Sequence, residues 1–139
     1  MYDFVDTNVA EIIGQGERAT LQILKDIYGD SAEYFTQFKF KDLLKGDWID
    51  TVTERQEKET LDIVVKTPKK TMVFRVQDKH HTGRITEARD TVQRKTLEWN
   101  DCIVVDLWFH DCPELWKDEV NDASKQEIIT ILKSQGIYP

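Results

Sequence analysis

Two neighbouring stretches decide the fold: residues 60–65, TLDIVV, and residues 71–79, TMVFRVQDK. Both are rich in the β-branched residues that favour strands. The link at 67–70, TPKK, is short enough for an antiparallel hairpin. Because side chains alternate along a strand, Gln77 and Lys79 are expected on one face, and the hairpin can bring Asp62 beside them. The sequence therefore predicts a carboxylate, an amide oxygen and an ammonium group at one point of the sheet.

Helical and strand patterns alternate around this hairpin. Apolar residues at helical spacing predict helices, and short runs of aromatic or β-branched residues predict strands. The expected elements are a helix at 17–28, strands at 33–40, 60–65 and 71–77, a helix at 85–99, a strand at 102–109 and a helix at 125–135. The sequence thus predicts an α/β fold with a mixed sheet and the order αβββαβα.

Some segments carry signals of their own, and others fit no regular period. The run at 102–109, CIVVDLWF, is almost continuously apolar, which predicts a central strand buried on both faces. Residues 124–127, SKQE, form a capping-box pattern at the start of the last helix. Residues 41–56 fit neither period and are expected to be irregular with a short helix, and the residues before Gly14 form either a short helix or an arm.

Length and composition indicate one globular domain spanning residues 1–139. Hydrophobic residues make up 40% of the chain and charged residues 32%, as in proteins that fold in water. No apolar run approaches the length that spans a bilayer, and the first residues lack the pattern of a signal peptide. We therefore expect an intracellular (cytoplasmic) protein without a membrane partner, in which Cys102 and Cys112 are free thiols.

The distribution of charge indicates a confined contact with a polyanion. The formal net charge is -7, which argues against a protein that coats nucleic acid non-specifically. Between residues 66 and 95, however, basic residues outnumber acidic ones. The alternative is an ordinary solvated surface.

The set Asp62, Gln77 and Lys79 suits hydrolysis of a phosphodiester. Magnesium needs only one or two carboxylates from the protein, and a lysine can stabilise the negative charge that develops on the phosphate. The strand–hairpin–strand with Asp62 and then Gln77-Asp78-Lys79 resembles the PD-(D/E)XK nuclease superfamily, over about residues 14–110. The resemblance implies a restriction-endonuclease-like three-layer α/β/α fold.

In that family an aspartate and a second acidic residue bind magnesium, and the lysine assists the nucleophile. Carried over, Asp62 is a metal ligand and Lys79 the catalytic lysine. Gln77 stands where an acidic residue is usual, and its amide oxygen can still bind the metal. Leu61 stands where the motif has proline. The implied cofactor is Mg²⁺, with Mn²⁺ able to substitute.

Glu17 is the candidate fourth member of the catalytic set and a further metal ligand. It follows Gly14-Gln15-Gly16 and heads the stripe of the first helix that should face the core. A carboxylate in that position needs a cation or hydrogen bonds. The sequence resembles the first helix of resolvase-type members of the family. Two alternatives stay open: Glu17 only favours the helix dipole, or Glu11 takes the role.

Further polar residues are candidates for contact with DNA, and a solvated surface is the alternative for each. They are Lys69, Lys70, His80, His81, Arg84, Arg89, Gln93 and Arg94. A zinc site built from His80, His81, His110 and Cys112 has little support, because no ligand spacing repeats. The residues 107–109 and 115–116 are an expected dimerisation surface if they are exposed.

The sequence therefore favours a magnesium-dependent endonuclease of the resolvase, restriction or homing type. It is expected to act on duplex or branched DNA as a homodimer, because cutting two strands needs two active sites. The alternative is a catalytically inactive protein with the nuclease fold that binds nucleic acid or a partner protein. A nuclease directed at RNA, or a toxin, is a third reading.

Overall fold

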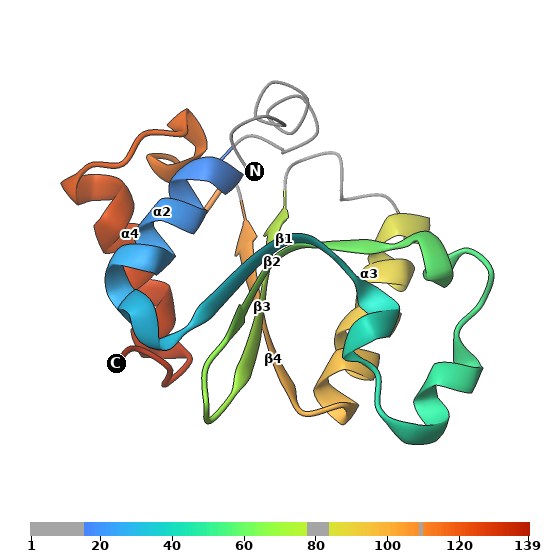
Figure 1. Ribbon diagram of the computed structural model, residues 1–139. Helices are drawn as coiled ribbons and strands as arrows, with labels where there is room; N and C mark the ends of the chain where they lie inside the picture. The colour runs from blue at the N-terminus through green and yellow to red at the C-terminus, as the bar shows by residue number, and fades with distance from the viewer. Residues whose placement is uncertain (1–15, 78–83, 109) are drawn as a thin grey trace, which may run out of the picture.

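One mixed sheet of four strands forms the centre of the protein (Figure 1). The computed structural model describes residues 16–77, 84–108 and 110–139, with residues 84–87 by their backbone alone. The strands are β1 (Glu33–Lys39), β2 (Thr60–Lys66), β3 (Thr71–Gln77) and β4 (Cys102–Trp108), in the order β1-β2-β3-β4. β2 is antiparallel to both its neighbours, whereas β3 and β4 are parallel. The prediction of an α/β fold with a mixed sheet is confirmed.

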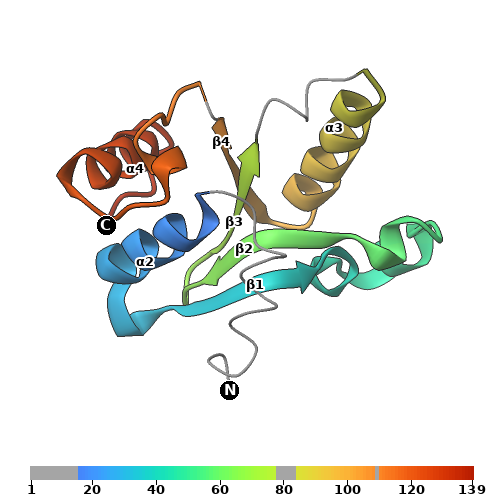
Figure 2. The ribbon, with the colours of Figure 1, turned by 90° about the horizontal axis from the view of Figure 1, so that it is seen from above.

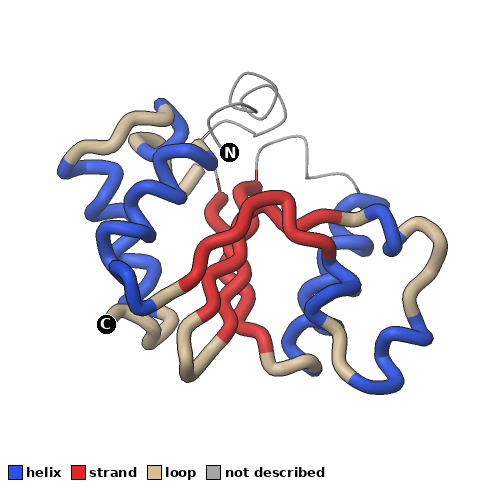
Figure 3. Tube along the Cα trace, in the orientation of Figure 1, coloured by secondary structure: helices blue, strands red, loops and turns tan. Residues whose placement is uncertain are grey.

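Helices cover the sheet on both faces (Figure 2). On one side lie α2 (Glu17–Tyr28) and α4 (Asp122–Ser134), and on the other lies α3 (Arg84–Trp99). The segment expected to be irregular contains three 3-10 helices between β1 and β2, visible as short turns in Figure 3. They are Phe40–Leu43, Gly46–Thr51 and Gln56–Lys58. Within the described residues, the order of α-helices and strands is αβββαβα, as predicted.

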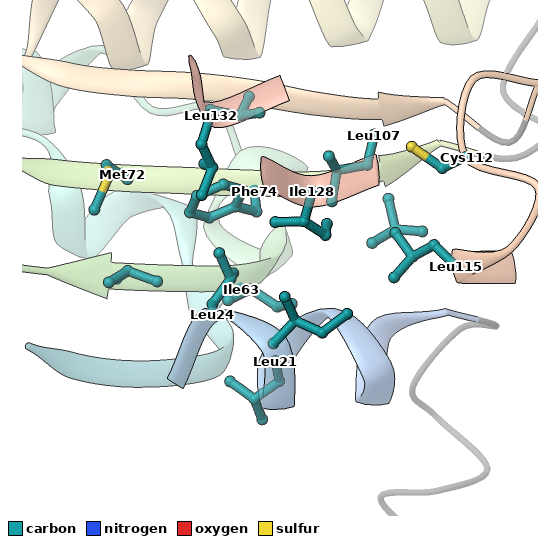
Figure 4. Close-up of a cluster of buried hydrophobic side chains, with 14 of the residues drawn as sticks. Leu21, Leu24, Ile63, Met72, Phe74, Leu107, Cys112, Leu115, Ile128 and Leu132 are labelled. Carbon is teal, nitrogen blue, oxygen red and sulfur yellow. The ribbon is translucent and has the colours of Figure 1, made fainter. Parts of the chain in front are cut away.

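The larger core lies between the sheet and the α2–α4 layer (Figure 4). Ile63, Phe74 and Leu107 from three strands are fully buried there, together with Leu24 of α2 and Ile128 of α4. These strand residues occupy alternate positions, so their neighbours in sequence face α3 instead. Burial of such side chains contributes roughly 1.5–3 kcal/mol each.

The second core fills the α3 side of the sheet. It contains Val64, Val73 and Val104 from three strands, Leu97 from α3 and Phe40 from the segment after β1. The alternation of the two cores fixes the facing along β3 and β4, whereas in β2 Leu61 packs in the second core although its position matches that of Ile63 in the larger one. Polar residues of β3 and β4 with the parity of Val73 and Val104 therefore lie on the α3 face.

The apolar strand at 102–109 is not central. β4 stands at the end of the order β1-β2-β3-β4, beside β3 alone among the described strands. The sequence of β4 is apolar because helices cover both faces of the sheet. Burial of both faces does not determine where a strand stands in the strand order. The strand ends at Trp108, and Phe109 lies outside the described residues.

The last helix begins three residues earlier than predicted. Asn121 is its N-cap: the Asn121 side chain accepts from the backbone N–H of Ser124, and the Ser124 hydroxyl accepts from the backbone N–H of Asn121. Glu127, expected to complete a capping box with Ser124, instead accepts from the backbone N–H groups of Glu114 and Leu115. The expected capping box was wrong because Asn121 is also a strong N-cap and lies closer to the true start.

We expect Asn121→Ala to lower the free energy of unfolding by about 1 kcal/mol, because it leaves the Ser124 N–H without its side-chain acceptor. Urea denaturation of the two proteins measures the difference. Asn121→Gly is the matched control and should cost only a few tenths of that amount. Equal losses from both substitutions would contradict the assignment of Asn121 as the cap.

Two further expectations concern the cysteines and the membrane. Cys102 and Cys112 are both buried free thiols, as expected. Among the described helices, none combines the length and apolar character needed to cross a lipid bilayer.

Candidate active site in the fork of the sheet

The sheet divides into two strand pairs at Asp62. The paired part of the β2–β3 ladder ends with Ile63 opposite Phe74. Beyond that point β2 stays with β1, through Leu61 opposite Phe38, and β3 stays with β4 as far as Gln77. In Figure 1 the two pairs visibly diverge. The result is a fork between β2 and β3.

Asp62 stabilises the base of this fork. Its Oδ2 accepts a hydrogen bond from the backbone N–H of Val76 at 2.9 Å. A carboxylate thus takes the place that a backbone carbonyl would occupy in a continuing ladder, and the N–H of Val76 is satisfied while the strands separate. The sequence therefore places an acidic side chain where the two strands part.

A cleft of about 130 Å³ occupies the fork. It is lined by side chains from β2, β3 and α3: Thr60, Leu61, Asp62, Arg75, Gln77, Asp90 and Gln93. This volume leaves room for a cation with several of its waters. The structure thus brings together Asp62 and Gln77, two of the four residues predicted to be catalytic.

A buried guanidinium, that of Arg75, lies in the same cleft. Arg75 is 5% exposed and binds Asp106 of β4 side-on, with Nε to Oδ1 at 2.7 Å and Nη2 to Oδ2 at 3.1 Å. Its Nη1 donates to the backbone oxygen of Asp90 and to Oε1 of Gln93, at 3.1 and 3.0 Å. Every nitrogen of the guanidinium therefore has an acceptor, which fixes its position between β4 and α3.

Asp106 lies between two guanidinium groups. Arg94 of α3 also pairs with its Oδ2, and the Asp106 side chain is only 7% exposed. Burial lowers the pKa of Arg94, and the neighbouring charge of Arg75 lowers it further. Burial likewise lowers the pKa of Arg75, while Asp90 and Asp62 raise it in opposition. Both arginines stay charged at neutral pH, so the single carboxylate of Asp106 counters two positive charges.

Gln77 is held by Asp106 as well. It is 2% exposed, and its Nε2 donates to Oδ1 of Asp106 at 3.3 Å. An ionised carboxylate only accepts hydrogen bonds, so the nitrogen end of the Gln77 amide must face Asp106. The carbonyl oxygen is then the end that can serve a cation.

The first residue of α2 is the buried Glu17, which is 7% exposed. The preceding Gly16 has φ +88°, and an added Cβ there would lie 3.3 Å from the backbone oxygen of Leu115. Asp118 accepts from the backbone N–H of Ala19 and helps to seat this end of the helix. The start of α2 and the end of β3 lie at the same end of the molecule in Figures 1 and 2. Glu17 is not among the residues that line the cleft in the fork.

The residues predicted to contact DNA do not all lie at the cleft. Lys69 and Lys70 lie in the β2–β3 hairpin, at the opposite end of β3 from Gln77, so the structure does not bring them to the cleft. Gln93 lines the cleft, but both ends of its amide are engaged, by Arg75 and by Oε1 of Glu59. Arg89 is exposed on α3.

Several predicted residues lie outside what the structure describes. They are Glu11, Lys79, His80 and His81, together with the side chain of Arg84. Their roles stay predictions.

The sequence motif does not include Arg75, Asp90 and Asp106, which the structure places at the cleft. The signal for two of them was present in the sequence: Arg75 and Asp106 are charged residues inside strands that are otherwise apolar. A charge in such a strand needs a partner, and the parity of Arg75 matches that of Gln77. The parallel register that pairs them, Arg75 opposite Asp106, could not be read from the sequence.

Two residues of the zinc set, His80 and His81, lie outside the described residues, whereas Cys112 is described. Among the described residues no three His, Cys, Asp or Glu side chains cluster as metal ligands. Burial raises the pKa of Cys112 to about 12, and Glu127 and Asp111 add to the effect. Because zinc binds the thiolate, this environment disfavours metal binding by sulfur.

The expected dimerisation surface is not exposed at its two leucines. Leu107 and Leu115 are both fully buried in the larger core, so these two residues cannot supply an exposed apolar surface. Trp99, by contrast, is 63% exposed and stacks on Trp48 with ring centroids 5.3 Å apart.

We expect Arg75→Met to lower the free energy of unfolding by about 3–5 kcal/mol, because it leaves buried Asp106 without its side-on partner. Urea denaturation at neutral pH measures the loss. Lys45→Met is the control: it removes an ion pair with Asp101 whose side chains are 66% and 80% exposed, and should cost no more than about 1 kcal/mol. A loss at Arg75 as small as that of the control would contradict the structural role of the buried pair.

Searches for similar proteins among family descriptions, curated proteins and solved structures found no match.

Proposed function

We propose that the protein is a magnesium-dependent endonuclease that hydrolyses DNA phosphodiester bonds, of the PD-(D/E)XK type. The observation that carries the proposal is the fork in the sheet, where Asp62 and Gln77 line one cleft at the point at which β2 and β3 part. An acidic side chain and an amide oxygen at such a point provide the hard oxygen ligands that magnesium prefers.

The topology supports the same proposal. Three antiparallel strands, a helix and a fourth strand parallel to the third form the sheet, with α2 preceding them. The αβββαβ core of the family that the sequence resembles has this order. We therefore propose the restriction-endonuclease-like class for the fold.

The side chains present fit a magnesium ion. Asp62 supplies a carboxylate and Gln77 a carbonyl oxygen, and magnesium keeps several waters, so few protein ligands are needed. We propose that Glu17, at the start of α2, is a further ligand. When bound, the ion supplies positive charge at the phosphate and lowers the pKa of a water.

The remaining residues are assigned by their position along the chain. Lys79 follows Gln77 by two residues, and its ammonium group is proposed to stabilise negative charge on the reacting phosphate. His80, His81, Arg84 and Arg89 follow it and are proposed to bind the DNA backbone. Since the net charge is -7, contact with DNA should be confined to this segment and the helix after it.

We expect Asp62→Asn and Lys79→Ala each to lower the rate of magnesium-dependent cleavage by about 100-fold or more, since each removes a charge that acts on the reacting phosphate. Plasmid and branched DNA, incubated with Mg²⁺ or Mn²⁺, are suitable substrates. Asp30→Asn, an equivalent change at an exposed residue after α2, should leave the rate unchanged. A wild-type protein that cuts none of these DNA forms with either metal would contradict the proposal.

Glu17 has its own test. We expect Glu17→Gln to raise the magnesium concentration needed for half-maximal cleavage, because it replaces the carboxylate of a proposed ligand with a neutral group. The magnesium titration of the cleavage rate measures the shift. If the titration is unchanged while the protein stays folded, Glu17 is a structural residue of α2 and not a ligand.

A second function is favoured by one observation: Gln77 carries no charge, and it is nearly fully buried. A site with fewer negative charges holds a cation less strongly. The protein would then be an inactive member of the nuclease fold that binds nucleic acid or a partner protein. DNA binding without cleavage, equal in wild type and Lys79→Ala, would favour this alternative.

We also propose a homodimer for the active form, because one domain of this size supplies one site and a duplex has two strands to cut. Sedimentation equilibrium, with and without a short duplex, tests this part.

A further inference from the structure

Asp106 accepts a hydrogen bond from the side-chain amide of Gln77, which lines the cleft in the fork. Oδ1 of Asp106 accepts both from Nε of Arg75, at 2.7 Å, and from Nε2 of Gln77, at 3.3 Å. Arg94 pairs with Oδ2. Asp106 is not among the residues that line the small cleft with Asp62; together with Gln77 it lines a second cleft of about 320 Å³.

We propose that Asp106 is a positioning residue, which holds the nitrogen end of the Gln77 amide so that the carbonyl oxygen is presented to a divalent cation beside Asp62. The inference rests on the proposed function. The two ends of an amide have nearly the same shape, so hydrogen-bond partners alone decide which one faces the cleft. With the nitrogen facing the cleft instead, two N–H groups would oppose the cation.

Asp106 can orient the Gln77 amide because the Asp106 carboxylate is itself held in one position. Arg75 donates hydrogen bonds to both carboxylate oxygens of Asp106. Through Nη1, the same guanidinium donates to the backbone oxygen of Asp90 and to the side chain of Gln93 on α3. The chain of contacts runs from α3 through Arg75 and Asp106 to Gln77. Preorganised partners of this kind behind a metal ligand set both its orientation and its affinity for the ion.

Asp106→Asn tests the proposal. The oxygen of the new amide is expected at the Oδ2 position, because that position faces the donors of both Arg75 and Arg94, whereas the Oδ1 position faces only one guanidinium. Its nitrogen then takes the Oδ1 position, beside Gln77. A nitrogen there attracts the Gln77 carbonyl and reverses the Gln77 amide. We expect the affinity for Mg²⁺, measured by calorimetry on the protein without DNA, to fall roughly 10–100-fold.

The double variant Gln77→Glu/Asp106→Asn removes the need to orient the side chain at position 77. A carboxylate at position 77 has two equivalent oxygens, so one can accept from the new amide while the other faces the cleft. The exchange also keeps one negative charge in the pair. We therefore expect it to restore most of the affinity lost in Asp106→Asn.

Asp90→Asn is the control for loss of charge. Asp90 lines the same cleft and pairs with Arg75 through Oδ1 at 3.9 Å, so its substitution removes an equal charge next to the same guanidinium. The Asp106→Asn variant should bind Mg²⁺ more weakly than this control. Equal losses in the two variants would show a charge effect alone and overturn the positioning role.

A measurement on the wild-type chain does not depend on the folding of any variant. The side-chain ¹⁵N–¹H resonances of Gln77 should shift during a Mg²⁺ titration, because binding through the carbonyl oxygen polarises the amide. Unmoved Gln77 resonances in a protein that binds Mg²⁺ would overturn the proposal.

The outcomes separate this inference from the proposed function. A wild-type protein that binds no Mg²⁺ and cuts no DNA would refute both the proposed function and the role of Asp106. A wild-type protein that binds and cuts, with an Asp106→Asn variant of equal affinity or a double variant that restores nothing, refutes only the role of Asp106.

Discussion

The hydrogen bond from the backbone N–H of Val76 to Asp62 is the contact on which the arrangement of the site depends. It satisfies a backbone donor at the point where β2 and β3 separate, and so permits the sheet to open without an unpaired N–H group. The opening gives the cleft its walls, since β2 turns away with β1 while β3 continues beside β4. One carboxylate thus both ends the strand pairing and lines the space that the fork creates.

The second constraint is charge buried beside that space. Arg75 and Asp106 lie within strands whose other residues are mostly apolar, and burying either without the other would be strongly unfavourable. Their side-on pairing, extended by Arg94, Gln93 and Gln77, converts five separate polar residues into one connected structure on the α3 face. Such a network restricts each side chain to one orientation, which is what a binding site for a small cation requires.

Much of the fold was accessible from the sequence because its patterns are local. The β-branched runs predicted β2 and β3, the short link predicted their hairpin, and helical periodicity placed α2 within the bounds observed. Where competing signals lie close together the prediction is wrong: the pattern predicts Ser124 as the cap of α4, but Asn121 holds that position. The apolar run at 102–109 indicated burial correctly, but burial does not determine the order of strands.

The candidate site could likewise be predicted from the sequence only where local patterns determine it. Asp62 and Gln77 could be placed together because a hairpin fixes their register within a few residues. The partners of Gln77 could not, because Asp106 reaches it through a parallel pairing across a helical crossover, which no local pattern encodes. Lys69 and Lys70 show the reverse error: they are near Asp62 in sequence, but the length of a strand separates them from Gln77.

The most direct test of the site is a crystal structure of the protein grown with Mn²⁺, examined by anomalous scattering. We expect a metal peak in the fork, with an oxygen of Asp62 and Oε1 of Gln77 both at coordination distance, about 2.0–2.3 Å. A fork without metal at saturating Mn²⁺, or a Gln77 amide with its nitrogen toward the ion, would contradict it.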